Sequence, residues 1–266
     1  MITALLAVAG PLLFAGPTPP CCNDAATASS ATVAGMPAPP PTPTADYDTV
    51  KMRGWTIRVN PAIAAKDPAL LAATLEELDH QLYAMTRVIP KPALARLKDI
   101  EIWVELDMHK TACMCYHVSK DWLIPNGYNP DKEGTVEIGN AQAFLDWTKG
   151  QPWMVLHELA HGYHDQVLGY DDPEIIAAFE RSRDDGYYDK VGHISGNPRR
   201  HYALTNQMEW FAETTEALYG TNDFHPYVRS ELREIDPEGA ALVRSVWELN
   251  PVPAGPAPGS ATNADS

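Results

Sequence analysis

The stretch HELAHGYHDQ, residues 157–166, lies within an apolar segment that begins at Pro152 and stops at Gly169. Proline is favoured in the first turn of a helix and glycine just after the last turn, so the sequence predicts a helix over 152–168. Leucine, alanine, tyrosine and valine recur at spacings of three and four, and apolar residues 153–155 widen this face to most of the circumference. We therefore expect a buried helix.

Two histidines of this helix, His157 and His161, lie one turn apart on one face, about 6 Å along the axis, so both imidazoles can converge on one cation. Glu158 is turned by about 100° from the first histidine, toward the space beside such a cation. A zinc ion with three protein ligands keeps a fourth position for water, and a neighbouring carboxylate can act as general base and acid. This HExxH pattern predicts Zn²⁺ as cofactor, the two histidines as ligands and Glu158 as the catalytic base of amide hydrolysis.

A third protein ligand must come from elsewhere, and the candidates are His164, Asp165 and a residue downstream. His164 is about 10 Å along the axis from the first histidine, too far for one straight helix, so we expect it in the cleft or beside the ligands. HYALTNQMEWFAETTEALYG, 201–220, predicts a second helix with Glu209 and Glu213 four residues apart. Glu209 can complete a His2Glu set. Glu213 can accept a hydrogen bond from a ligand imidazole. The alternative is an ordinary surface helix on which both glutamates face solvent.

HELAHGYHD, followed about forty residues later by YALTNQMEWFAE, resembles the gluzincin domain of the anthrax lethal factor type. This resemblance implies zinc ligation by His157, His161 and Glu209, with Glu158 as the catalytic glutamate. It also implies that Tyr202 faces the substrate carbonyl and donates to the developing oxyanion. The likeness covers about half of the expected folded segment and includes no large receptor-binding or substrate-docking domain, so it implies metallopeptidase chemistry and no particular substrate.

The rest of the pattern predicts an α+β, zincin-like domain. Its small N-terminal mixed sheet with helices is followed by a helical C-terminal part that carries the HExxH helix and the Glu-ligand helix. We expect strands over 51–61, 99–106 and 135–140, a helix over 67–88, and a loop between the second and third strands. The strand TVEI, within 135–140, is interpreted either as an edge strand to which an extended peptide adds or as an ordinary sheet strand.

The two ends differ in composition from the middle of the chain. We interpret 1–45 as a signal peptide followed by a Pro/Ala-rich linker, 46–250 as the catalytic domain and 251–266 as a disordered tail. Residues 1–16 are apolar but too short to span a bilayer, and no Lys or Arg precedes the apolar run. We expect a secreted or periplasmic protein, and the alternative is a disordered apolar tail.

Charge and cysteines limit the partners. The 266-residue chain has a formal net charge of −15, which disfavours nucleic acid and an anionic membrane surface as partners. We expect a peptide or protein substrate, no nucleic acid, no stable membrane insertion and a monomer.

Cys113 and Cys115 are spaced too closely to bridge one another easily. We expect partly buried thiols, with a disulfide to Cys21 or Cys22 as the alternative.

Two other kinds of function stay open at this point. One is a catalytically silent binding module with the zincin fold, but an intact Glu158 and Tyr202 argue against it because a silent metal site has no use for either. The other is a metal-free helical interaction domain, and the zinc content of the protein separates it from both others.

Overall fold

A computed structural model describes residues 40–108, 111 and 113–249. The apolar segment 1–16, the residues Cys21 and Cys22, and the tail 251–266 lie outside the described residues. One mixed sheet has the strand order β1-β2-β3-β5-β4, in which β3 runs parallel to β2 and β5 whereas β1 and β4 are antiparallel edge strands. The strands are β1 (Asp48–Met52), β2 (Trp55–Val59), β3 (Ile102–Val104), β4 (Met114–Tyr116) and β5 (Val136–Ile138).

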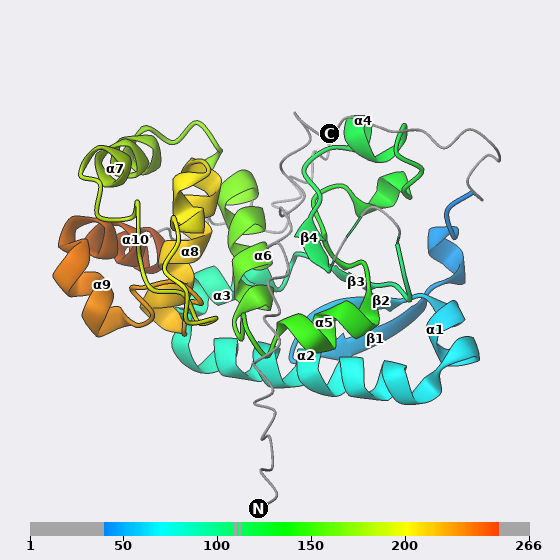
Figure 1. Ribbon diagram of the computed structural model, residues 1–266. Helices are drawn as coiled ribbons and strands as arrows, with labels where there is room; N and C mark the ends of the chain where they lie inside the picture. The colour runs from blue at the N-terminus through cyan, green and yellow to red at the C-terminus, as the bar shows by residue number, and fades with distance from the viewer. Residues whose placement is uncertain (1–39, 109–110, 112, 250–266) are drawn as a thin grey trace, which may run out of the picture.

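Helices make up most of the remaining structure, and the predicted α+β class is confirmed (Figure 1). The predicted long helix over 67–88 is α2, which begins after Asp67, whose side chain accepts a hydrogen bond from the Leu70 amide as an N-cap. The α-helices are α1 (Pro61–Lys66), α2 (Pro68–Val88), α3 (Lys91–Leu97), α4 (Lys120–Leu123), α5 (Ala141–Trp147), α6 (Met154–Tyr163), α7 (Pro173–Asp184), α8 (Gln207–Tyr219), α9 (Arg229–Ile235) and α10 (Pro237–Leu249). Short 3-10 turns are η1 (Thr44–Asp46), η2 (Pro130–Lys132) and η4 (Tyr202–Leu204), and η3 (His164–Leu168) is a π-helical turn.

Two predictions about the sheet need correction, and the structure decides between the two interpretations of TVEI. The segment 51–61 contains a hairpin turn rather than one strand, because Arg53 and Gly54 both have positive φ (50° and 101°), as a two-residue hairpin turn requires. The predicted loop before TVEI contains β4. TVEI itself is the inner strand β5, paired on both sides, so it is not the edge strand; β4 is.

The two faces of the sheet carry different chemistry because side chains alternate along each strand. Register places Ile102 and Val104 of β3 on one face with the apolar residues of β5 and with Met114 and Tyr116 of β4. The opposite face carries Trp103, Glu137 and Cys115, which are neighbours across the same three strands. All these residues are buried, so both faces of the sheet are covered.

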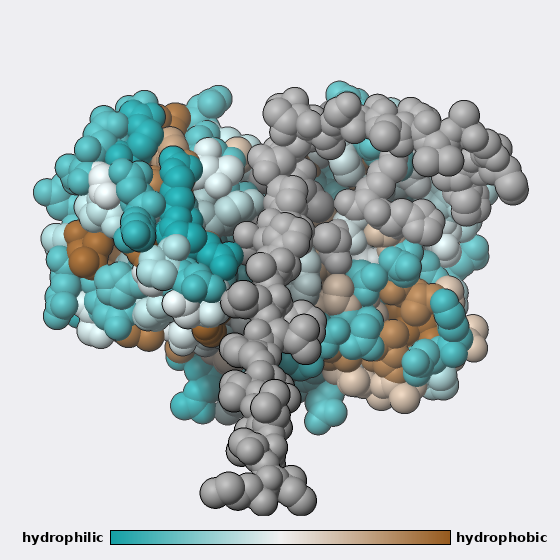
Figure 2. Space-filling model, viewed as in Figure 1, coloured by the Kyte–Doolittle hydropathy of each residue, from teal (hydrophilic) through white to brown (hydrophobic). Residues whose placement is uncertain are grey.

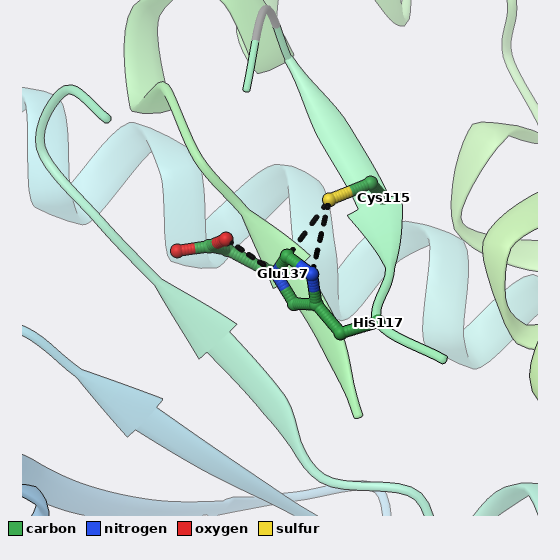
Figure 3. A group of neighbouring side chains, drawn as sticks. All are labelled: Cys115, His117 and Glu137. Atoms are coloured by element: carbon green, nitrogen blue, oxygen red, sulfur yellow. Dashed lines mark hydrogen bonds and ion pairs between the residues drawn. The ribbon is translucent and has the colours of Figure 1, made fainter. Parts of the chain in front are cut away.

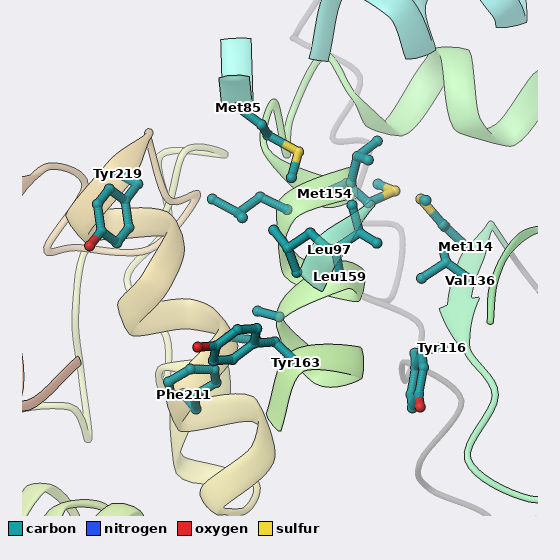
Figure 4. Close-up of a cluster of buried hydrophobic side chains, with 14 of the residues drawn as sticks. Met85, Leu97, Met114, Tyr116, Val136, Met154, Leu159, Tyr163, Phe211 and Tyr219 are labelled. Carbon is teal, nitrogen blue, oxygen red and sulfur yellow. The ribbon is translucent and has the colours of Figure 1, made fainter. Parts of the chain in front are cut away.

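Helix α6, the predicted HExxH helix, packs against β4 on one side and α8 on the other (Figure 4). All ten of its residues are buried, as its nearly continuous apolar surface predicts. Gly162 permits the close approach, because an added Cβ would lie 2.6 Å from Ile100 Cδ1 and 3.0 Å from a Tyr116 ring carbon. The helix passes through Gly162 without unwinding and continues into η3, which ends at Leu168 with Gly169 as its C-cap.

The face seen in Figure 2 is mainly hydrophilic, with small apolar patches. Large apolar side chains that are exposed among the described residues are scattered over the surface: Tyr83, Val118, Ile124, Ile194 and Ile235. No helix in the described part of the chain is long and apolar enough to cross a membrane.

Candidate metal centre

The predicted ligands come together where α6 packs against α8. Glu209 is in the first turn of α8, and this turn is held by the Asn206 side chain, which accepts hydrogen bonds from the amides of Met208 and Glu209 at 2.9 Å each. His157 and His161 extend from successive turns of α6, with their ring centroids 4.8 Å apart. The i, i+4 spacing brings the two imidazoles together, the N-cap fixes the turn that carries Glu209, and the packing of α6 against α8 joins the three side chains.

The three ligand atoms fit a cation. Oε2 of Glu209 lies 3.0 Å from Nε2 of His157 and 3.3 Å from Nε2 of His161. Nitrogen and oxygen ligands of a tetrahedral zinc ion are about 3.4 Å apart at bond lengths of about 2.1 Å, so little movement is needed. Nδ1 of His161 has no hydrogen-bond partner among the described residues. All three side chains are 0–1% exposed, and buried groups of this kind need a partner.

The electrostatics of the cluster favour an ionised Glu209. Burial alone opposes its charge, but the neighbouring imidazoles of His161 and His157 hold the pKa of this carboxyl well below its usual value. A deprotonated carboxylate and two imidazoles are the donor set of a His2Glu zinc site.

Glu158 is buried beside this cluster and is held by a different element. Its Oε2 accepts a hydrogen bond of 2.9 Å from the Tyr116 amide of β4. The amide of His117 donates to the Thr135 carbonyl, and the carbonyl of Cys113 accepts from the Gly139 amide. These two residues flank β4, so every second residue along this segment points its main-chain groups toward β5. Tyr116 therefore points its amide away from β5, on the outer side of the edge strand. Burial raises the pKa of Glu158.

The side chain that orients His157 is Glu216, which the sequence analysis missed. Oε1 of Glu216 lies 2.7 Å from Nδ1 of His157, whereas Oε1 of Glu213, the predicted partner, is 3.8 Å away. Glu213 and Glu216 lie within about 40° and 20° of the direction of Glu209 on α8, so helix geometry permits either contact and the packing of α8 against α6 selects Glu216. A carboxylate at Glu216 that accepts this hydrogen bond requires the imidazole proton on Nδ1, and Nε2 then faces Glu209 as a free ligand atom.

Glu216→Ala should weaken zinc binding by about 10 to 100-fold, because it removes the acceptor that fixes the tautomer of His157. Competitive zinc titration measures this. Glu216→Gln retains an acceptor oxygen and should lose less, and Glu213→Ala, on the same helix, is the matched control. Greater zinc loss in Glu213→Ala than in Glu216→Ala would contradict this assignment.

The other predicted residues lie around the cluster. His164 is in η3 with its ring 5.0 Å from those of Tyr170 and Phe211, outside the group of converging ligand atoms, and burial lowers its pKa to about 4. Tyr202 is half-buried in η4, which packs against α8. The structure adds Tyr170, whose hydroxyl donates to the His161 carbonyl at 3.4 Å.

Tyr170 gave no signal in the sequence, because it returns to α6 only through the turn at Gly169, where φ is +84°. Burial, followed in size by the charge of Asp165 and by smaller effects that include Glu209 and Glu158, raises the pKa of its hydroxyl. The hydroxyl therefore remains protonated, as its hydrogen bond to the His161 carbonyl requires.

Comparison of the chain with models of protein families, with curated proteins and with solved structures found no match.

Proposed function

We propose that this protein is a zincin-like metallopeptidase that hydrolyses peptide bonds with zinc held by His157, His161 and Glu209. The observation that carries the proposal is the convergence of three ligand atoms from α6 and α8. A fourth buried group, Glu158, lies beside them and is held by the main-chain amide of Tyr116 in β4. A metal-free helical interaction domain has no need to bury two imidazoles next to a carboxylate.

Zinc bound here would supply Lewis-acid polarisation of a water molecule and of the scissile carbonyl. The remaining work belongs to residues of the chain. Glu158 takes the proton from water and delivers it to the leaving amine, and its raised pKa suits a group that must both accept and donate. The Tyr116 amide holds Oε2 of Glu158, which fixes the orientation of the carboxylate. Tyr202 donates to the developing oxyanion, as the family resemblance implies.

The edge strand β4 suits the binding of an extended peptide better than the predicted TVEI strand does. The outer side of β4 carries the main-chain groups of Met114 and Tyr116, and the Tyr116 amide already contacts Glu158. The Tyr116 amide is taken by Glu158, so a peptide added along this edge would pair with the other outward main-chain groups of β4 and would pass the general base. This arrangement favours a peptide or protein as the substrate.

Cleavage of a peptide library by the full chain, purified without chelator, tests this function. We expect hydrolysis that stops when a chelator removes the metal and returns when zinc is added, because polarisation of the water and of the scissile carbonyl depends on the metal ion. Zinc content is measured on the same samples. Protein that contains zinc at this site but cleaves no peptide would support the silent binding module, and protein without any transition metal would exclude a metallopeptidase.

A further inference from the structure

A second group of metal-ligating side chains lies on the face of the sheet opposite α6 (Figure 3). Cys115 of β4 is the direct cross-strand partner of Glu137 of β5, and His117 follows two residues later on the same face. Nε2 of His117 lies 2.6 Å from Oε2 of Glu137 and 3.6 Å from Sγ of Cys115. The three side chains are 0–3% exposed.

The spacing of these atoms suits zinc. Sulfur and nitrogen ligands of a tetrahedral zinc ion are about 3.6 Å apart at bond lengths of about 2.3 and 2.1 Å, and this matches the separation between Cys115 and His117. The corresponding nitrogen–oxygen separation is about 3.4 Å, so Glu137 has to withdraw from His117 by about 0.8 Å. A thiolate, an imidazole and a carboxylate are all established zinc donors.

A buried lysine shows how charge is distributed around this group. Nζ of Lys132 contacts Oε1 of Glu137 and lies 2.6 Å from Oε1 of Glu105, which also accepts a hydrogen bond from Tyr47. Burial opposes the charge of Lys132, yet the two carboxylates raise its pKa. Lys132 contacts one oxygen of Glu137, and the other oxygen, Oε2, contacts His117.

Lys132 provides one positive charge against the two carboxylates of Glu105 and Glu137. A buried cluster of this kind requires a further cation facing Glu137, either on the imidazole of His117 or at a bound metal. A zinc ion that binds with loss of the thiol proton adds one net positive charge and meets this requirement.

We propose that Cys115, His117 and Glu137 hold a second, structural zinc ion. Thr111, whose hydroxyl oxygen lies 3.9 Å from Sγ of Cys115, also borders this cluster. The site also bears on the proposed peptidase activity, because Tyr116, whose amide holds Glu158, lies between two of the ligands. A zinc ion bound here would clamp the strand segment that orients the general base.

The experiment uses the full chain with Cys21 and Cys22 changed to Ser, so that Cys113 and Cys115 are its only thiols. We expect two zinc ions per chain and, by zinc X-ray absorption, a sulfur neighbour at about 2.3 Å. Replacement of zinc by cobalt should produce a thiolate-to-cobalt charge-transfer band. Cys115→Ser should lower the content to one zinc and remove the band. The matched control Cys113→Ser should keep both, since that thiol faces Met154 Sδ at 3.4 Å on the α6 side.

Failure of this proposal is distinguishable from failure of the peptidase proposal. Glu209→Ala should lose one zinc but retain the thiolate band. A content of one zinc per chain without a sulfur neighbour overturns the site at Cys115 and leaves the site at Glu209. A content of one zinc with a sulfur neighbour that is unaffected by Glu209→Ala overturns the site at Glu209 and leaves the site at Cys115. If Cys115→Ser does not fold, the absorption spectrum of the parent chain decides the question, because absence of sulfur there is sufficient to reject the site.

Discussion

Glu209→Ala should remove one zinc ion per chain and abolish peptide hydrolysis. Two imidazoles from α6 leave the shell without its third protein ligand, and the carboxylate that now lies 3.0 and 3.3 Å from them is the only acidic group in that set of converging ligand atoms. The loss of zinc affinity should exceed the 10 to 100-fold that is typical of removing a partner outside the coordination shell. Competitive zinc titration and the rate of peptide cleavage measure the two effects.

His164→Ala is the matched control, because His164 is the other candidate for the third ligand. It should retain zinc and lose at most about 10 to 100-fold in affinity. For His164 to bind, the helix would have to unwind at Gly162, whereas α6 continues through that residue into η3. Zinc retained in Glu209→Ala but lost in His164→Ala would reverse the assignment.

Glu158→Gln should keep its zinc and lose hydrolysis by about 10² to 10⁴-fold, the usual contribution of a positioned general base and acid. Glutamine has the same shape and can still accept the hydrogen bond from the Tyr116 amide, so the change removes basicity with little effect on packing. The value of kcat/KM and the zinc content, measured on the same preparation, separate the two properties.

Two outcomes contradict the role given to Glu158. Loss of zinc together with activity would make Glu158 a ligand, and unchanged activity would require a different base. Asp165 serves as the comparison, since it is also acidic and close in sequence but accepts a hydrogen bond from the Tyr116 hydroxyl at 2.7 Å instead. Asp165→Asn should therefore reduce hydrolysis much less than Glu158→Gln does.

Local sequence patterns were sufficient to predict the two helices of the candidate site. The apolar repeat, Pro152 and Gly169 predicted the helix over 152–168, and the structure has α6 and η3 over most of that range. The i, i+4 spacing of the histidines and the N-cap of α8 are also local, so the convergence of His157 and His161 could be predicted. That Glu209 meets them was an inference from a second helix, and the structure brings these three residues together.

Tertiary packing decided which neighbour touches which ligand. Glu213 and Glu216 are both on α8 and both buried, and only the rotation of α8 against α6 brings Glu216 rather than Glu213 to 2.7 Å from His157. The approach of Tyr170 depends on the turn at Gly169 in the same way. Such contacts join segments far apart in sequence or rotated by a fraction of a turn, and periodicity carries no information about either.

The sequence by itself determined the α+β class, the buried helix and the spacing of its zinc-type donors, because these depend on propensity and on a repeat within one segment. Only the tertiary structure decided the order of the sheet, the choice of β4 as edge strand and the meeting of Cys115, His117 and Glu137. The three strands concerned are three residues long and buried on both faces, so their residues do not indicate which strand pairs with which. Their order follows from which partners close the main-chain hydrogen bonds, and that is a property of the folded chain as a whole.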